Sequence, residues 1–161
     1  MIVLNASPLI SLGKISGLQL LKKCFEEVII PNEVYEEIIH KEYNIESVAL
    51  KKSIDEEWIK IEKVNTHRIL KTASIGKGEK EAISLAFKYK CILILDDDNA
   101  RKFAELLGIE VHGTLYCIYL AYKKEIIKKE QVKDMVKKLI DNGFYISTEV
   151  YSEFLDLLKN N

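Results

Sequence analysis

Residues 92–98, Ile-Leu-Ile-Leu-Asp-Asp-Asp, join a short apolar run to three consecutive carboxylates. An apolar run of this length predicts a buried β-strand, and it places Asp96–Asp98 at the end of that strand. Adjacent unpaired carboxylates repel each other, so the arrangement is costly unless a cation, basic side chains or free helix N–H groups meet it. Alternatively, these acids are loop residues and one of them caps the helix expected at Asn99–Leu107. The stretch therefore predicts either a polar site or a capped helix start.

Similar apolar runs alternate with helical patterns along the chain. The other candidate strands are Ile2–Leu4, Val28–Ile30, Ile109–Val111 and, alternating like a half-exposed edge strand, Trp58–Val64. The helical patterns lie at Leu9–Leu21 as a helix pair or broken helix, and at Glu33–His40, Ile45–Ile54, Glu79–Tyr89, Arg101–Leu107, Thr114–Lys123, Lys133–Ile140 and Val150–Leu158, the last capped by Ser147 or Thr148. Because the strands are apolar on both faces, we expect an α/β fold with a mostly parallel sheet flanked by helices and Ile92–Leu95 as its central strand.

The size and charge of the chain narrow its class. With 161 residues it fits a single domain, 1–161, in which helices from about residue 125 onward pack on the core or extend it. The 24 Lys and Arg residues balance 25 Asp and Glu residues. This balance excludes a broad positive field for a polyanionic partner, so any such partner would depend on local basic patches.

The cysteines and the N-terminus bear on the compartment. Cys24, Cys91 and Cys117 are odd in number, lie in mostly apolar surroundings and form no CxxC pair. They predict reduced core thiols rather than a disulfide framework or a zinc site. The first eight residues lack a basic segment followed by a long apolar one, and no apolar run approaches the roughly 18 residues of a membrane span. We therefore expect a cytoplasmic protein that does not span a membrane.

Polar side chains follow two of the predicted strands. Asn5 and Ser7 come after the first strand, and Asp96–Asp98 come after Ile92–Leu95. In parallel sheets functional groups collect at the carboxyl ends of the strands. Glu79 begins the helix before Ile92–Leu95 and continues its buried stripe, because positions 82, 83 and 86 are its i+3, i+4 and i+7 neighbours. This geometry favours Glu79 over Glu81 as an inward-facing acid, although the first helical turn could bring both close.

The chemistry of these groups indicates a divalent cation. Four or five carboxylates that converge at a sheet edge supply the hard oxygen ligands of Mg²⁺ or Mn²⁺. Two such ions about 3.5–4 Å apart promote phosphodiester hydrolysis. The sequence contains no GxxxxGK[ST], GxGxxG, GxSxG or HExxH motif. His40, His67 and His112 stand singly, and we interpret them as surface or structural residues.

Four motifs follow one another along the chain. They are Ile-Val-Leu-Asn-Ala-Ser-Pro-Leu-Ile at 2–10, Ile-Pro-Asn-Glu-Val-Tyr-Glu-Glu-Ile at 30–38, Gly-Glu-Lys-Glu-Ala-Ile-Ser-Leu-Ala at 78–86, and Leu-Asp-Asp-Asp-Asn-Ala-Arg at 95–101 with Gly108 and Gly113-Thr114-Leu115. Together with the closing segment around Asn142-Gly143-Phe144 and Tyr151, they resemble a prokaryotic PIN-domain group of the DUF3368 type. The resemblance spans nearly the full chain.

The resemblance implies a fold, an activity and a set of site residues. PIN domains are similar to flap-endonuclease cores, bind Mg²⁺ or Mn²⁺ through acids, and cut RNA or single-stranded nucleic acid. Many are toxins of toxin–antitoxin pairs and form dimers. By this resemblance the site comprises Asn5, Ser7, Glu37, Glu79, Glu81, Asp96 and Asp97, with Asp98 as a local addition. Helix geometry alone does not separate Glu37 from Glu36.

Asn5 departs from the family pattern, because PIN nucleases generally carry Asp at that position. An amide oxygen can coordinate a cation, but it brings no charge and cannot act as a base. If Asp98 points inward, it restores the missing charge. If it points outward, the site is one carboxylate short. Around these groups, Lys77, Lys80 and Arg101 are placed to hold substrate phosphates or to neutralise the acids.

Two hypotheses follow for the function. The first is a divalent-metal-dependent ribonuclease, the toxin of a toxin–antitoxin pair, that acts as a homodimer and is bound by a small antitoxin protein. Its expected catalytic residues are Glu79, Asp97, Asp96 and Glu37, and its expected metal ligands are Asp97, Asp96, Glu79, Asp98, Asn5 and Glu81, with Ser7 supporting them. The second is a catalytically inactive PIN fold that binds RNA or a protein and keeps its acids as a structural cluster.

Overall fold

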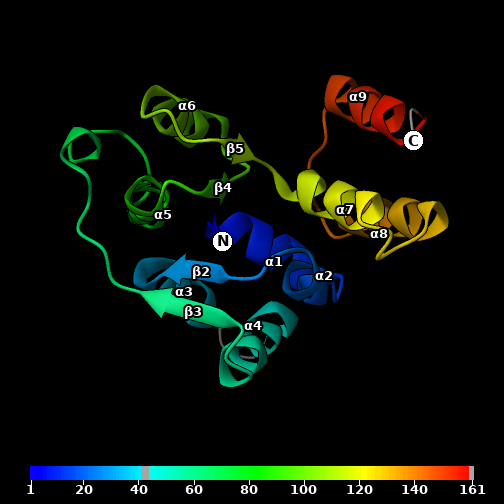
Figure 1. Cartoon of the computed structure of the whole chain (residues 1–161), viewed down its shortest axis with the longest axis horizontal. Coiled ribbons are helices and arrows are strands. Elements are labelled where there is room, and N and C mark those ends of the chain that lie inside the picture. Colours follow the sequence, from blue (N-terminus) through cyan, green and yellow to red (C-terminus); the bar gives the residue numbers. More distant parts are fainter. Residues whose placement is uncertain (41–43, 160–161) are drawn as a thin grey trace.

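The computed structural model describes residues 1–40 and 44–159, which form a parallel sheet covered by helices on both faces (Figure 1). The five strands are β1 (Ile2–Leu4), β2 (Val28–Pro31), β3 (Ile59–Glu62), β4 (Ile92–Ile94) and β5 (Val111–His112). Every neighbouring pair is parallel, and the order across the sheet is β3-β2-β1-β4-β5. The prediction of an α/β fold with a parallel sheet is confirmed.

The helices of the described residues connect these strands. They are α1 (Ala6–Lys14), α2 (Leu18–Cys24), α3 (Asn32–Ile39), α4 (Ile45–Asp55), the 3-10 turn η1 (Arg68–Leu70), α5 (Lys77–Tyr89), α6 (Asp98–Leu106), α7 (Thr114–Lys123), α8 (Lys129–Asp141) and α9 (Thr148–Lys159). None of these helices is long and apolar enough to cross a membrane.

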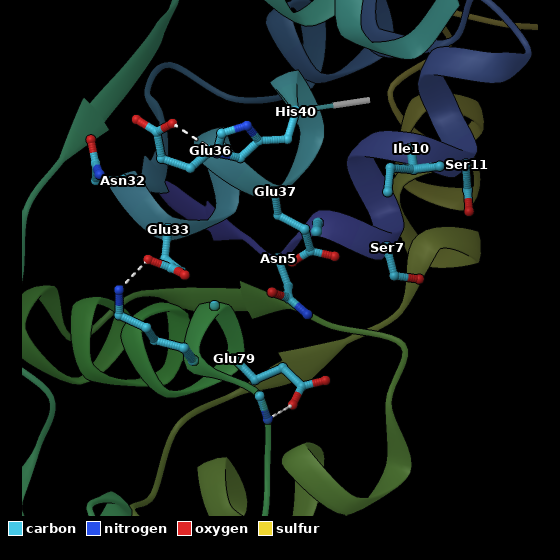
Figure 2. Close-up of a pocket in the computed structure, with 14 residues that line it drawn as sticks. Asn5, Ser7, Ile10, Ser11, Asn32, Glu33, Glu36, Glu37, His40 and Glu79 are labelled. Carbon is cyan, nitrogen blue, oxygen red and sulfur yellow. Dashed lines mark hydrogen bonds and ion pairs between the residues drawn. The ribbon is translucent and has the colours of Figure 1, made fainter. Parts of the chain in front are cut away.

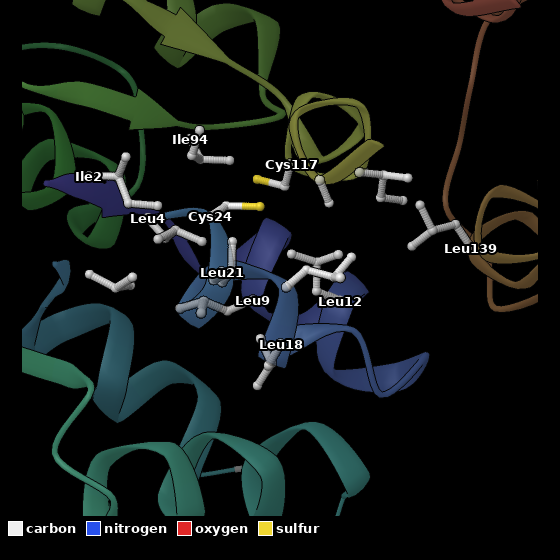
Figure 3. Close-up of a cluster of buried hydrophobic side chains, with 14 of the residues drawn as sticks. Ile2, Leu4, Leu9, Leu12, Leu18, Leu21, Cys24, Ile94, Cys117 and Leu139 are labelled. Carbon is white, nitrogen blue, oxygen red and sulfur yellow. The ribbon is translucent and has the colours of Figure 1, made fainter. Parts of the chain in front are cut away.

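The sheet divides the core into two layers, because successive strand residues point to opposite faces. On β1, Ile2 and Leu4 pack into a large cluster with α1, α2 and α7 (Figure 3), whereas Val3 packs on the other face with α5 and α6. The large cluster also contains Phe154 and Leu158 of α9, so the last helix shares this core. Strands buried on both faces explain why the sequence shows continuous apolar runs rather than alternation.

The strand order corrects one prediction. The central strand is β1, and β4 lies between β1 and β5. The alternation of strands and helices gives the number and direction of strands, but it does not give the side of the sheet to which a crossover returns. Here the chain runs outward from β1 to β3 and then returns to β4 on the other side of β1. The order therefore reverses between β1 and β4, which is where ligands bind in open parallel sheets.

Local interactions explain where several elements differ from their predicted bounds. The expected helix pair at Leu9–Leu21 is α1 and α2, separated at Ser16, whose φ is 56°. Helix α8 begins at Lys129 rather than at Lys133, because the Gln131 side chain accepts a hydrogen bond from the Lys128 N–H and closes the first turn. The Ser147 hydroxyl oxygen accepts from the Val150 N–H and thereby caps α9.

The cysteines are free thiols, as predicted. Cys24 and Cys117 lie in the large core, and Cys91 is half-buried. Burial raises the pKa of the Cys117 thiol far above its ordinary value, so this thiol stays protonated.

Candidate active site

Two polar segments meet where β1 and β4 end. The Asn5 N–H donates to the Ile94 carbonyl oxygen at 3.0 Å, which joins the two strand ends. Two residues later, the Ser7 hydroxyl donates to Asp96 Oδ2 at 3.1 Å. The polar groups predicted at the two strand ends therefore do share one edge of the sheet, at the point where the strand order reverses.

An open cleft of about 920 Å³ lies beside this edge, between the starts of α1 and α5 and the length of α3. Figure 2 shows the Asn5 amide between the side chains of Glu37 and Glu79, which also line the cleft. Asn5 is only 5% exposed, and its Oδ1 atom is buried with no hydrogen-bond partner among the described residues. A buried carbonyl oxygen without a partner is costly, so this atom is poised to accept a ligand.

Gly78 keeps the space in front of these oxygens open. A Cβ atom at this position would lie 3.4 Å from Glu37 Oε2, 3.8 Å from Asn5 Oδ1 and 3.3 Å from a methyl carbon of Val34. The oxygens of Asn5 and Glu37 thus face the same small volume, which any larger residue at position 78 would partly fill.

The acids that line the cleft, Glu33, Glu36, Glu37 and Glu79, differ in their partners. Glu79 closes the first turn of α5, because its Oε2 accepts a hydrogen bond from the Gly76 N–H at 2.6 Å. Glu37 is exposed and has no hydrogen bond or ion pair with any residue in 1–40 or 44–159. For Glu36, by contrast, the Oε2 atom lies 3.7 Å from Nε2 of His40. The structure thereby separates the two neighbouring acids that helix geometry left equivalent.

A second pocket of about 520 Å³ adjoins the cleft and shares Ser7 and Ser11 with it. Asp96 lines this second pocket, and both of its carboxylate oxygens accept hydrogen bonds. Oδ1 accepts from the Thr114 N–H at 2.7 Å, and Oδ2 accepts from the Thr114 hydroxyl at 2.7 Å as well as from Ser7. A Cβ atom at position 113 would lie 2.9 Å from Asp96 Oδ1, so Gly113 permits this close approach.

The other two acids of the triplet have separate positions. Asp97 is the N-cap of α6, where its Oδ1 accepts from the Ala100 N–H at 2.7 Å, and it lines neither the cleft nor the second pocket. Asp98 is the first residue of α6 and lines the second pocket. It does not line the cleft, so it does not replace the charge that Asn5 lacks there.

The remaining predicted site residues are held by other groups. Glu81 accepts a hydrogen bond from the Glu33 N–H at 3.2 Å, at the start of α3, and lies outside the cleft. Lys77 lines the cleft and forms an ion pair with Glu33 that raises the pKa of its ammonium group. Lys80 donates to the Lys71 carbonyl oxygen at 3.3 Å.

Arg101 joins two strand ends. Its guanidinium donates to the Leu95 carbonyl oxygen at 3.1 Å and to the Val111 carbonyl oxygen at 3.0 Å. It therefore fixes the segment after β4 against β5. As with Lys77 and Lys80, its cationic group already has an intramolecular partner.

The acids predicted to form one site, Glu79, Glu81 and Asp96–Asp98, do not all line one space in the described part of the chain. Among the described residues, no group of three or more His, Cys, Asp or Glu side chains is arranged to hold a metal ion. Asn5, Glu37 and Glu79 share the cleft, whereas Asp96 and Asp98 face the second pocket. Sequence spacing identifies the strand end, but it does not reveal which backbone N–H groups and hydroxyls reach each acid.

The contact between Thr114 and Asp96 is not predicted by the sequence, which indicates only that Thr114 lies in a motif at a helix start. Thr114 donates two hydrogen bonds to Asp96 and is fully buried. The available signal was Gly113-Thr114 directly after a predicted strand, since a glycine followed by a hydroxyl residue at a helix start is suited to hold a carboxylate.

The oxygen atoms that line the cleft are suited to bind a divalent cation. It offers the Oδ1 of Asn5, which has no partner among the described residues, and the carboxylate of Glu37, both beside the space kept open by Gly78, and the second oxygen of Glu79 in the same cleft. Two carboxylates and an amide oxygen are hard ligands of the kind that hold Mg²⁺ or Mn²⁺ together with water.

Comparisons with known proteins agree with the sequence motifs. A family model described as DUF3368, PIN domain, matches residues 1–160. Among solved structures, the chain is similar to a PilT N-terminus domain protein from the hyperthermophilic archaeon Sulfolobus solfataricus P2, with a TM-score of 0.53 and 21% sequence identity over 73% of this chain and 90% of that one. Among curated proteins, none matches the chain.

Proposed function

Because the chain belongs to the DUF3368 group of PIN domains, a nuclease-type family that typically uses divalent metals, we propose that it is a divalent-metal-dependent ribonuclease whose active site is the Asn5 cleft. The observation that carries the proposal is the buried Oδ1 of Asn5, which has no hydrogen-bond partner among the described residues and lies beside two carboxylates. A cation bound here would interact favourably with the amide oxygen and with both negatively charged carboxylates.

The residues of the cleft would divide the work. Asn5, Glu37 and Glu79 would hold a Mg²⁺ or Mn²⁺ ion, which when bound would supply positive charge to stabilise the leaving oxygen and activate a water molecule. Glu37 has no partner among the described residues, so its carboxylate is available to orient the attacking water. Lys77 lines the same cleft, and its ammonium group can exchange from Glu33 to a substrate phosphate. Asp96 and Ser7 would keep the neighbouring strand end in place.

The proposal is tested by heating the protein with increasing Mg²⁺ or Mn²⁺ and by incubating it with single-stranded RNA. A cation that binds only the folded state must raise the melting temperature. At one hundred times its Kd it adds about 2.7 kcal/mol to the free energy of unfolding. We expect Glu37→Gln to abolish both the shift and cleavage. The matched variant Glu105→Gln, which removes the same charge from the exposed face of α6 outside the cleft, should retain both. If millimolar metal produces no shift and no RNA is cut, the protein is not a metal-dependent nuclease.

A second candidate function has its own supporting observation. Asp96, Asp97, Glu79 and Glu81 all accept hydrogen bonds from this chain, so the acids also have structural roles. An inactive PIN fold that binds RNA or a protein would account for these bonds. It predicts RNA binding that is independent of metal, with no cleavage. The toxin role, the small antitoxin protein and the homodimer stay predictions of the family resemblance.

A further inference from the structure

The second pocket has no part in the proposed hydrolysis, yet it adjoins the cleft. It lies between the starts of α6 and α7 and the segment 142–147, which joins α8 to α9 and is orange in Figure 1. Ser7 and Ser11 on α1 line both spaces. A single strand with one phosphate in the cleft would reach this pocket by crossing Ser7 and Ser11 on α1. Its volume of about 520 Å³ lies within the usual range of pockets for small organic groups.

Aromatic side chains line the pocket. Tyr116, Phe144 and Tyr145 all contribute to its wall. The Tyr116 ring stacks on the His112 ring at a centroid distance of 3.8 Å, which holds it in a fixed plane. Tyr145 is 86% exposed, so its ring is available to a ligand. Flat rings in an open pocket beside a phosphate site are suited to stack a nucleobase.

The charged residues that line the pocket are Lys14, which is exposed, Asp96, Asp98 and Arg101, and they differ in how far they are engaged. The oxygens of Asp96 and the guanidinium of Arg101 already have partners within the chain. Asp98 has an exposed carboxylate that makes no hydrogen bond or ion pair within residues 1–40 and 44–159. An ionised carboxylate only accepts hydrogen bonds. It therefore matches the amino groups of cytosine, adenine and guanine, and it repels the O4 atom that uracil presents at the corresponding position.

We propose that this pocket binds the nucleobase next to the scissile phosphate and that Asp98 selects an amino-bearing base over uracil. The position beside a scissile phosphate rests on the proposed nuclease function, whereas base selection by Asp98 does not require cleavage. A competing explanation is that Asp98 only complements the positive end of the α6 dipole. That explanation predicts a small loss of stability in Asp98→Asn and no effect on base preference.

The test measures binding without metal. Fluorescein-labelled RNA octamers of cytidine or of uridine are titrated with the protein in EDTA at low salt, and Kd is obtained from fluorescence anisotropy. We expect the cytidine octamer to bind about tenfold more tightly. In Asp98→Asn the ratio should fall below about twofold, because an amide offers both a donor and an acceptor and so suits either base. Glu105→Gln makes the same charge change on the exposed face of α6, outside both spaces, and should keep the ratio.

The stacking part of the proposal has its own variant. Tyr145→Ala should weaken binding of both octamers by about tenfold and leave their ratio unchanged, since stacking is tolerant of base identity. Tyr151→Ala removes a ring that is exposed on α9 but does not line the pocket, and it should change neither Kd.

The outcomes separate this inference from the nuclease proposal. Equal affinity of the native protein for the two octamers, or a ratio that survives Asp98→Asn, overturns the inference even if RNA is cleaved. A ratio that depends on Asp98 in a protein that neither responds to metal nor cleaves RNA supports base selection by Asp98 and overturns the nuclease proposal.

Discussion

The ends of β1 and β4 lie side by side, but their polar residues differ in how many hydrogen bonds they accept from the rest of the chain. After β4, Asp96 accepts three hydrogen bonds from Ser7 and Thr114. After β1, the Asn5 Oδ1 accepts none within the described part of the chain, although it is buried and lies in a cleft with Glu37 and Glu79. One strand end satisfies its acid internally, and the other leaves an oxygen unsatisfied.

The difference indicates which of the two strand ends is structural and which is poised for a ligand. A carboxylate with several N–H and O–H donors is stable without a cation. A buried carbonyl oxygen with no donor persists where something outside the chain completes it, or where its cost is offset elsewhere. The Asp96 end should therefore respond to mutation through stability, and the Asn5 cleft should respond through metal binding.

The largest expected effect is that of Asp96→Ala. It leaves the N–H and the hydroxyl of the fully buried Thr114 without their acceptor, and each unsatisfied donor costs about 1–3 kcal/mol. We expect the free energy of unfolding, measured by urea denaturation, to fall by about 3 kcal/mol. Asp98→Ala removes a neighbouring acid that has no such partner and should stay within about 0.5 kcal/mol of the native protein. Equal effects of the two substitutions would show that Asp96 is not structural.

Asn5→Asp tests the other strand end. Without metal, a further negative charge at this buried position beside Glu37 and Glu79 should lower the free energy of unfolding by about 2 kcal/mol. The melting temperature should fall by about 5 °C. With Mn²⁺ the loss should disappear, because the added carboxylate becomes a charged ligand. The melting temperature with and without metal measures both effects. If Asn5→Asp is destabilised equally in the two conditions, the cleft does not hold a cation.

Gly78→Ala should act on metal binding with little effect on the fold. Alanine favours the helix by about 1 kcal/mol over glycine, but its Cβ would enter the space between Asn5 and Glu37. We expect unchanged or slightly higher stability without metal and a metal-induced shift reduced by at least half. Gly17→Ala also places a Cβ in a crowded position, against Met135, but Gly17 does not line the cleft. A metal response that falls equally in both variants would argue against the role given to Gly78.

The sequence predicted most of this arrangement and failed at a definable step. Apolar runs identified the strands, and helix periodicity favoured Glu79 over Glu81 as the inward-facing acid; of the two, Glu79 lines the cleft. The triplet Asp96–Asp98 was expected to be either a polar site or a helix cap, and the structure divides these roles among its members. Such a division depends on long-range donors, since Thr114 lies 18 positions from Asp96. Spacing within one strand and one helix carries no information about them.

Strand order set a second limit on prediction from sequence. Every connection between parallel strands is a crossover, and the sequence of a crossover helix does not record whether the next strand adds outside β3 or beside β1. The position of β4 next to β1 is what brings Ser7 to Asp96. Predicting that both strands end at the same edge was therefore possible, whereas predicting that they are neighbours was not.

The smallest effect concerns a third strand end, where a cation from the chain itself meets the acid. Glu62, at the end of β3, accepts from Lys88 at 2.5 Å and from the Tyr89 hydroxyl at 2.5 Å, and these two bonds lower the pKa of its carboxyl. A folded-state pKa below the unfolded value gives stability that is present above the ordinary value of 4.5 and lost as the pH falls through the lowered pKa.

We therefore expect Glu62→Gln to be less stable than the native protein at pH 6–7, and the difference in melting temperature to vanish as the pH falls below 4.5. The effect should be small, because the Lys88 side chain is half exposed and solvent screens the pair. Glu105→Gln, an exposed acid without an ion pair in the described residues, should show no such pH dependence. A difference that persists at pH 3 would mean that Glu62 acts through packing rather than charge. The ion pair with Lys88 would then not be what distinguishes this strand end from the Asn5 cleft.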